Sequence, residues 1–221
     1  MKILSIDIDY ITSGEDFSEV LNLFSSALFR NPGMEVKFSQ YHVDIIDLFK
    51  HEYNPMFILN IDMHHDIIYN DICDPAEIRN ASVDSTNWLG WICAHRRVEK
   101  YIWCKNNFSE HFDGELLNAF HTLYVKGKTY DVVDSRNIIF SSKMAVTERA
   151  NDCYLKFRPK IEVENKIQKY FYDINFDKIF VCLSPDYTDA GNYFYYDCLK
   201  NLHINFSKKR KTEKKISAKN R

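Results

Sequence analysis

Two short apolar segments of the chain each end in acidic or imidazole side chains that alternate with other residues. These side chains are Asp7 and Asp9 after the first segment, and Asp62, His64 and Asp66 after the second. Alternate residues of an extended segment lie on one face, so each set is predicted to point in one direction. Carboxylates together with imidazole suit Mn²⁺, Fe²⁺ or Zn²⁺. The spacing therefore indicates a divalent-cation site; the alternative is a pair of hydrogen-bonded or solvated strand ends.

Both segments are predicted to be β-strands. Residues 56–61 form a mostly apolar run behind Asn54 and Pro55, which is typical of a buried parallel strand. Residues 2–10 are a second short apolar strand that ends in its two aspartates. If the strands are neighbours, their carboxylates lie together, which is costly unless a cation compensates the charge. Open α/β sheets bind ligands beyond the carboxyl ends of their strands, which is where these side chains stand.

The rest of the chain alternates between helical and strand patterns. Apolar residues at helical spacing predict a helix over residues 15–30 that Asn31, Pro32 and Gly33 stop. The further elements expected are helices over 41–50, 87–95, 163–172 and 191–202, and strands over 101–104 and 178–183. This alternation predicts an α/β fold with a mainly parallel sheet.

Composition excludes several classes of protein. The 221 residues are 45% hydrophobic, which is ordinary for a globular chain, and no apolar run approaches the length of a membrane span. The N-terminus has no secretory signal pattern, so a cytoplasmic protein without a membrane partner is predicted. The six cysteines are scattered without a C-x-x-C pair, and the six glycines form no phosphate-binding loop.

The C-terminal end differs in charge from the body. Residues 208–221 hold eight basic residues against one Glu213, a net +7, so the formal total of −2 leaves −9 for the preceding chain. We expect one domain over residues 1–206 and a basic, disordered tail over 207–221. A basic tail can contact nucleic acid, but a solvated end is the more common role of such a segment, so a nucleic-acid partner is not expected. The acidic body favours a cationic substrate.

The two motifs resemble those of the arginase and ureohydrolase superfamily. Asp62-x-His64-x-Asp66 is similar to its metal-binding D-x-H-x-D, and Ser5-Ile6-Asp7-Ile8-Asp9 to its S-x-D-x-D. His42 occupies the place of the superfamily's upstream metal histidine. Asn87-Trp88 and the following His95 resemble an arginase-like branch that includes the peptide arginases, which convert arginine residues of ribosomally made precursor peptides into ornithine. The resemblance covers roughly residues 1 to 105.

The chain departs from ordinary arginases in three ways. Its S-x-D-x-D precedes the D-x-H-x-D instead of following it. Residues 10–13 replace the usual third aspartate and proline, and the glycine pair before the first metal histidine is absent. The resemblance therefore implies a shortened relative with an arginase/deacetylase-like three-layer fold and a rearranged strand order.

By resemblance, the site holds two Mn²⁺ ions, for which Fe²⁺ or Co²⁺ could substitute in vitro. The implied ligands are Asp62 and Asp7 as bridges, His42 and Asp66 on one ion, and His64 and Asp9 on the other. Two such ions acidify water, so hydroxide is available near neutral pH for attack on a guanidinium carbon. The products are ornithine and urea.

Proton transfer and substrate binding need further residues. Asp66 is predicted to relay a proton to the leaving amine, and His95 or His65 to supply the next one. Asp186, after the 178–183 strand, is predicted to pair with the guanidinium because a carboxylate matches its planar donors. The expected partner is an arginine-containing precursor peptide, and homo-oligomerisation is left open.

Two other functions remain as alternatives. A zinc-dependent, deacetylase-like amidohydrolase shares a D-x-H motif, but its single metal ion would leave Asp7 or Asp9 without a role. A noncatalytic protein could instead bind nucleic acid through the basic tail. Two bound Mn²⁺ ions per chain favour the first function, and one Zn²⁺ favours the amidohydrolase. Removing residues 208–221 would abolish a tail-dependent activity and leave a metallohydrolase active.

Overall fold

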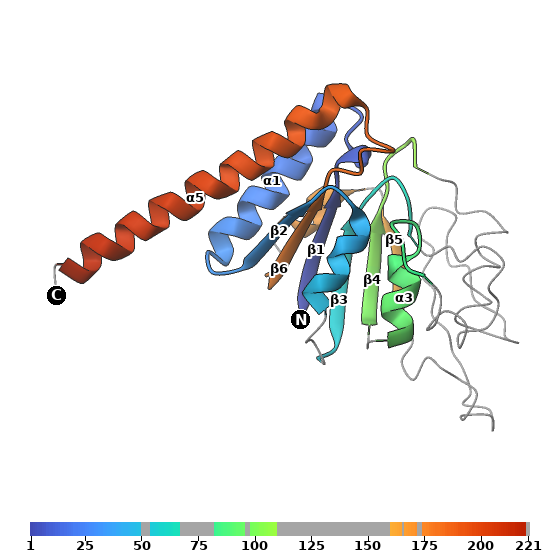
Figure 1. The fold of residues 1–221 in the computed structure, drawn as a ribbon, viewed down its shortest axis with the longest axis horizontal. Helices are drawn as coiled ribbons and strands as arrows, with labels where there is room; N and C mark the ends of the chain where they lie inside the picture. The colour runs from blue at the N-terminus through green and yellow to red at the C-terminus, as the bar shows by residue number, and fades with distance from the viewer. Residues whose placement is uncertain are drawn as a thin grey trace, which may run out of the picture.

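The fold is built around one six-stranded parallel sheet (Figure 1). The computed structural model describes residues 1–49, 54–66, 82–95, 98–109, 160–164, 166–171 and 174–219, and the statements below concern these residues. The strand order is β2-β6-β1-β3-β4-β5, and every neighbouring pair is parallel. The strands are β1 (Lys2–Asp7), β2 (Glu35–Ser39), β3 (Met56–Ile61), β4 (Val98–Cys104), β5 (Lys160–Glu164) and β6 (Lys178–Cys182).

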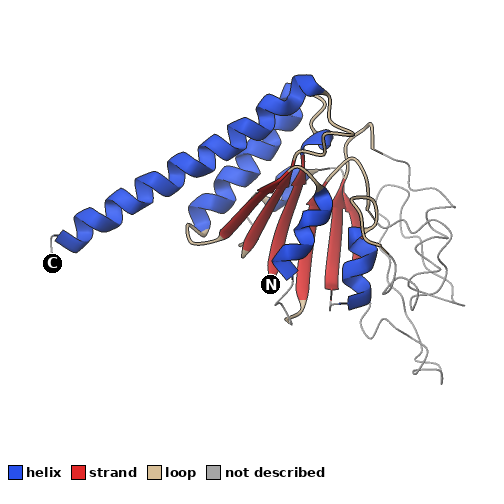
Figure 2. Ribbon diagram, viewed as in Figure 1, coloured by secondary structure: helices blue, strands red, loops and turns tan. Residues whose placement is uncertain are grey.

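Helices cover both faces of the sheet, which gives three layers (Figure 2). On one face lie α1 (Gly14–Arg30) and α5 (Tyr193–Lys219); on the other lie the 3₁₀ helix η2 (His42–Phe49) and α3 (Trp88–His95). Because successive strand residues point to opposite faces, neighbouring residues join different cores. Ile3 packs with the η2 and α3 layer, whereas Leu4 packs with the α1 layer. The α/β fold and parallel sheet predicted from the sequence are confirmed at this level.

Local signals explain where α1 begins and ends. The Ser13 hydroxyl accepts a hydrogen bond from the Asp16 amide at 3.1 Å, and the Asp16 carboxylate accepts one from the Ser13 hydroxyl at 2.9 Å. The first of these bonds caps one free N–H group of the first turn, and the second holds the Ser13 hydroxyl in place. Arg30 closes the last turn, where a cation is favoured by the helix dipole. The predicted helix over residues 15–30 therefore agrees with the structure.

Two expected helices differ in the structure. Residues 41–50 were expected to be α-helical, but residues 42–49 form a 3₁₀ helix. The helix predicted over 163–172 is wrong, because residues 160–164 form β5 beside β4 and only Ile167–Tyr170 form a short 3₁₀ helix, η3. The sequence of β5 alternates isoleucine and valine with charged residues, which is a strand pattern that pairing with β4 stabilises.

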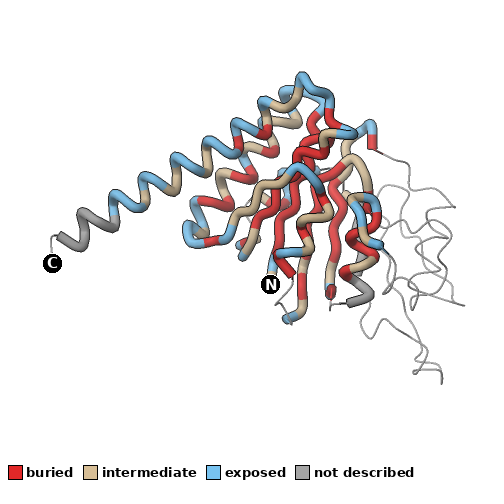
Figure 3. The backbone as a smooth tube through the Cα atoms, viewed as in Figure 1, coloured by how far each residue is buried: buried red, intermediate tan, exposed pale blue. Residues whose placement is uncertain are grey.

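The last helix is longer than its apolar pattern predicts. α5 extends through residues 207–219, where the sequence predicts a disordered tail, and leaves the body of the molecule (Figure 3). Phe206 packs edge-on against Phe29 of α1, with ring centroids 5.3 Å apart, and anchors the helix before its basic part. Lysine and arginine have high helix propensity, so the helix continues once it is nucleated. Among the described residues, no helix has both the length and the apolar character to cross a membrane.

The carboxyl edge of the sheet collects the predicted ligands. β1 and β3 are direct neighbours, with Ile6 opposite Ile61, so Asp7 and Asp62 follow at the same height. Ser5 and Asp7 share the face of Ile3, and Asp62 shares the face of Ile58, both of which point toward η2 and α3. His42 is the first residue of η2 and lies at the same edge of the sheet.

Candidate metal centre

One imidazole nitrogen of His42 lies among three carboxylates. Its Nδ1 is 3.0 Å from Asp7 Oδ2, 3.3 Å from Asp62 Oδ2 and 3.1 Å from Asp66 Oδ2. All four side chains are buried. One nitrogen carries at most one hydrogen, so it cannot donate to three oxygens at once. Ligands about 2.0–2.1 Å from an octahedral ion are about 3 Å apart, so these separations fit the edges of a coordination shell.

A second group of ligand atoms stands next to the first. His64 Nδ1 lies 2.9 Å from Asp9 Oδ2 and 3.9 Å from Asp62 Oδ1. Asp62 therefore belongs to both groups, with Oδ2 facing His42 and Oδ1 facing His64. A carboxylate that presents one oxygen to each of two groups has the geometry of a bridging ligand. The buried Asp and His clusters can hold a metal ion.

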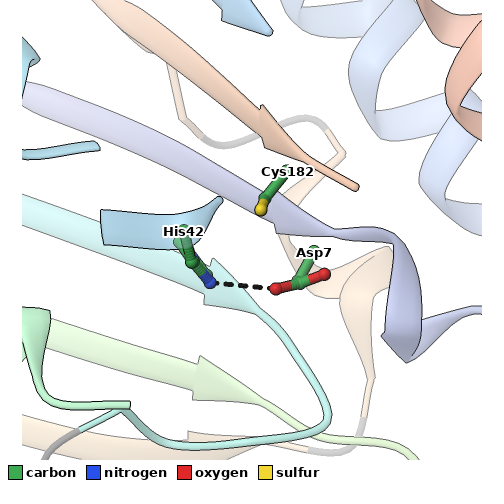
Figure 4. Close-up of side chains that lie close together, drawn as sticks. All are labelled: Asp7, His42 and Cys182. Atoms are coloured by element: carbon green, nitrogen blue, oxygen red, sulfur yellow. Dashed lines mark ion pairs between the residues drawn. The ribbon is translucent and has the colours of Figure 1, made fainter. Parts of the chain in front are cut away.

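Asp7 is placed differently from Asp62. It shares a group with His42 and Cys182, as Figure 4 shows, and its Oδ2 lies toward His42. Its other oxygen, Oδ1, accepts a hydrogen bond from the Asp9 amide at 3.3 Å. The bridging role that the resemblance implies for Asp7 thus stays a prediction. Cys182 was not singled out from the sequence, where scattered cysteines gave no pattern.

The two sets of ligands are not held in extended chain, contrary to the sequence expectation. β1 ends at Asp7, and a 3₁₀ turn over Ile8–Tyr10 carries Asp9 toward His64. After β3 the chain bends, because Oδ1 of Asp62 accepts a hydrogen bond from the backbone N–H of His64 at 2.8 Å. Asp66 has a left-handed φ of 55°, and its Oδ2 lies 3.1 Å from Nδ1 of His42.

Neighbouring side chains orient the ligands. Ser5 Oγ lies 2.8 Å from Nε2 of His42, which leaves Nδ1 for the carboxylate group when Nε2 carries the hydrogen. The Trp88 indole N–H donates to Asp66 Oδ2 at 2.5 Å. The Ser184 hydroxyl donates to Asp7 Oδ2 at 2.5 Å. Neither contact was predicted from the sequence, because nothing in the local pattern around Trp88 or Ser184 indicates a bond to a ligand.

Backbone strain is concentrated in the same place. Among the described residues, the non-glycine residues with positive φ are Asp66 at 55° and Ser184 at 47°. Such backbone costs roughly 1–3 kcal/mol per residue and is kept at functional sites when the surroundings determine it. Both residues contact the group around His42, so the strain accompanies the placement of its ligands.

Burial and mutual repulsion shift the pKa values of this cluster. Burial, followed by the charges of Asp7 and Asp62, raises the pKa of Asp9 to about 8. Burial and the charge of Asp62 likewise hold the pKa of Asp66 well above its usual range. Burial alone would lower the pKa of His42, but the surrounding carboxylates raise it well above normal. In the absence of a metal ion, Asp9, Asp66 and His42 therefore tend to stay protonated, which reduces the negative charge of the cluster.

These pKa directions predict how stability depends on pH. Because the folded-state pKa of Asp9 is about 8 and its unfolded value 3.8, folding favours the protonated form, and the metal-free protein should lose stability as pH rises between them. The raised pKa of His42 acts in the same direction above its unfolded value of 6.5. A divalent ion replaces those protons. We expect the rise in melting temperature on adding Mn²⁺ to grow from about pH 6 to about pH 9; a constant rise would contradict this account.

The remaining predicted site residues lie as follows. His65 is buried with its ring edge-on to Trp103, and it lines a pocket of about 190 Å³ together with Asp7, Asp9, His42, His64 and Asp66. His95 ends α3, but its side chain lies outside the described residues, so its role stays a prediction. Asp186 is exposed and lines an adjoining pocket instead of this one.

No match was found when the chain was compared with models of protein families, with curated protein sequences or with solved structures. We therefore argue its function from the geometry of the site and from the motifs of the sequence.

The indole of Trp88 offers a test of the surroundings of the cluster. Trp88→Phe removes the donor to the buried Asp66 carboxylate, so we expect metal affinity to fall about 10- to 100-fold. Titration calorimetry with Mn²⁺ measures the change. Trp103→Phe is the matched control, because the buried Trp103 indole donates to the backbone oxygen of Asp62 and not to a carboxylate. Equal losses of affinity in the two variants would show that packing, and not the Asp66 contact, is responsible.

Proposed function

We propose that this protein is a binuclear, manganese-dependent peptide arginase that hydrolyses the guanidinium of arginine residues in a peptide to ornithine and urea. The observation that carries the proposal is Asp62, which presents one carboxylate oxygen to the His42 group and the other to the His64 group. The arginase-like D-x-H-x-D and S-x-D-x-D motifs supply these residues and imply the arginine substrate.

The donor set fits two divalent ions better than one. Asp7 and Asp66 both lie beside the His42 imidazole, Asp9 lies beside the His64 imidazole, and such carboxylate-rich ligands suit Mn²⁺. A pair of such ions supplies hydroxide near neutral pH and stabilises developing negative charge. A single-zinc amidohydrolase would need only three protein ligands, so the His64 and Asp9 pair has no role in it.

The side chains of the pocket bind and orient the substrate and move protons. His64 is partly exposed, with 27% of its side chain accessible, and its pairing with Asp9 holds its ring at the mouth of the pocket. Asp66 is buried, with Oδ2 3.1 Å from Nδ1 of His42, and from this position it would relay the proton that the leaving amine needs. Burial of the cluster keeps bulk water from the reacting groups.

The substrate proposal rests on charge and access. Free arginine offers an α-amino and an α-carboxylate group that an enzyme must neutralise, whereas an internal arginine of a peptide has neither. Asp9 and His64 line a pocket that shares four lining residues with a second pocket, so there is room for peptide next to the arginine. The acidic body of the chain attracts a cationic peptide.

The test is incubation of the protein with Mn²⁺ and an arginine-containing peptide. The peptide should lose one CH₂N₂ unit per modified arginine, and an equal amount of urea should appear. Free arginine, tested in parallel, should be a poor substrate. Two bound Mn²⁺ per chain should accompany the activity. Efficient cleavage of free arginine without urea from peptides would overturn the peptide substrate, and one Zn²⁺ per chain with amide hydrolysis would overturn the arginase activity.

A further inference from the structure

A second pocket of about 300 Å³ adjoins the candidate metal centre. The two pockets share Ser85, Thr86, Ser184 and Tyr187 as lining residues, so a ligand can extend from one into the other. The second pocket adds side chains from three loops at the carboxyl edge of the sheet: Tyr41 before η2, Asp84 before α3, and Pro185 and Asp186 after β6.

Two exposed tyrosines line this pocket. Tyr41 is 49% exposed and Tyr187 is 54% exposed, although large aromatic rings are usually buried. The Tyr187 ring lies 5.0 Å from the ring of His64, at the boundary between the two pockets. An aromatic face left open beside a reactive site is available for a ligand, and it attracts cations through its negative π surface.

The charged residues of the pocket are both acidic. Asp84 and Asp186 line it, and among its described lining residues there is no lysine, arginine or histidine. The Asp84 carboxylate is held in place because Oδ1 accepts hydrogen bonds from the Thr86 amide at 2.8 Å and the Thr86 hydroxyl at 2.7 Å. Asp186 is exposed at the same pocket. Aromatic faces combined with carboxylates recognise a basic side chain.

We propose that this pocket, lined by Tyr41, Asp84, Asp186 and Tyr187, binds a second basic side chain of the peptide, next to the arginine that is hydrolysed. This inference rests on the proposed function for the identity of the reacting residue. It assigns Asp186 to a neighbouring lysine or arginine and not to the reacting guanidinium, because Asp186 does not line the pocket of the metal ligands. The enzyme therefore selects arginines that lie close in sequence to another basic residue.

The test uses product peptides, which are not turned over. Fluorescent peptides that contain ornithine are mixed with the Mn²⁺-loaded protein, and binding is measured by anisotropy. Lysine, alanine or glutamate is placed in turn at each of the two positions on either side of ornithine. At one of these positions we expect lysine to bind about tenfold more tightly than alanine, and glutamate to bind more weakly than alanine.

Substitutions of the pocket residues test whether the preference for lysine arises in this pocket. Asp186→Asn and Tyr41→Ala should each reduce the lysine preference to less than about threefold, whereas Tyr41→Phe should keep it. Glu35→Gln is the control, because it removes the same charge from an exposed residue at the start of β2, on the opposite edge of the sheet. Binding that does not depend on the neighbouring residue, or a lysine preference that survives both pocket variants, would overturn the inference.

Urea release from the matching arginine peptides separates this inference from the proposed function. Urea release from all peptides, with equal product binding, would keep the arginase activity and reject the subsite. A lysine preference in product binding, with no urea from any peptide, would keep the cation subsite and reject the arginase activity.

Discussion

Asp62→Asn should abolish metal binding in both groups and the proposed activity with it. The substitution keeps the size of the side chain but removes the charge and one of the two oxygens that face His42 and His64. We expect less than one bound Mn²⁺ per chain, and a fall in kcat of at least roughly a thousandfold, which is about 4 kcal/mol in the barrier. Metal content after desalting and urea release from an arginine peptide measure the two effects.

Two further variants make this result specific. His64→Ala should lose metal from the His64 group alone, because His64 Nδ1 faces Asp9 and Oδ1 of Asp62, whereas Oδ2 of Asp62 faces His42. Asp47→Asn removes an aspartate that is 48% exposed and paired with Lys37, and it should leave metal content and turnover unchanged. Full metal occupancy and turnover in Asp62→Asn would refute the shared-ligand assignment.

His42→Ala should strongly destabilise the metal-free protein. Its imidazole, whose pKa is raised by the carboxylates, is the cation among Asp7, Asp62 and Asp66. Removing one partner of a buried charge cluster typically costs about 3–5 kcal/mol, and a cavity adds to it. Urea denaturation in the presence of a chelator measures the free energy of unfolding.

His203→Ala is the matched control for that experiment. His203, on α5, is half-buried and its ring lies 5.9 Å from Phe38, away from the acidic cluster, and burial lowers its pKa. We expect His203→Ala to lower the free energy of unfolding by at least about 2 kcal/mol less than His42→Ala does. A similar cost for the two variants would show that His42 contributes packing and not charge compensation. His42→Gln, which retains a polar side chain, gives a second measurement if the alanine variant does not fold.

Several features of the site follow from local sequence pattern. The run before Asp62 and the run before Asp7 are apolar and short, which is sufficient to predict two buried strands. Parallel strands end at the same edge of a sheet. The carboxylates at their ends are therefore predicted to lie together as soon as the two strands are assumed to be neighbours, which they are. His42 was predicted only through the resemblance to the arginase superfamily, and the structure places it at the same edge as the carboxylates.

Other features depend on contacts between distant residues, which local pattern does not encode. The helix predicted over 163–172 overlaps the end of β5, whose alternating residues form a strand because they pair with β4, far away in sequence. Residues 207–219, predicted to be part of a disordered tail, continue the helix α5, which contacts α1 through Phe206 and Phe29, far apart in sequence. Likewise, the position of Asp186 in a neighbouring pocket depends on three loops that meet only in the folded chain.

The sequence by itself determined which side chains could bind a cation and at which edge of the sheet they gather, because strand periodicity and the end of each apolar run are local properties. The tertiary structure decided how those side chains are divided between the His42 group and the His64 group. The turn after β1 and the positive φ of Asp66 separate them into two groups joined by Asp62. Turns of this kind are kept by long-range contacts, such as the bond from Trp88 to Asp66, so their geometry exists only in the folded protein.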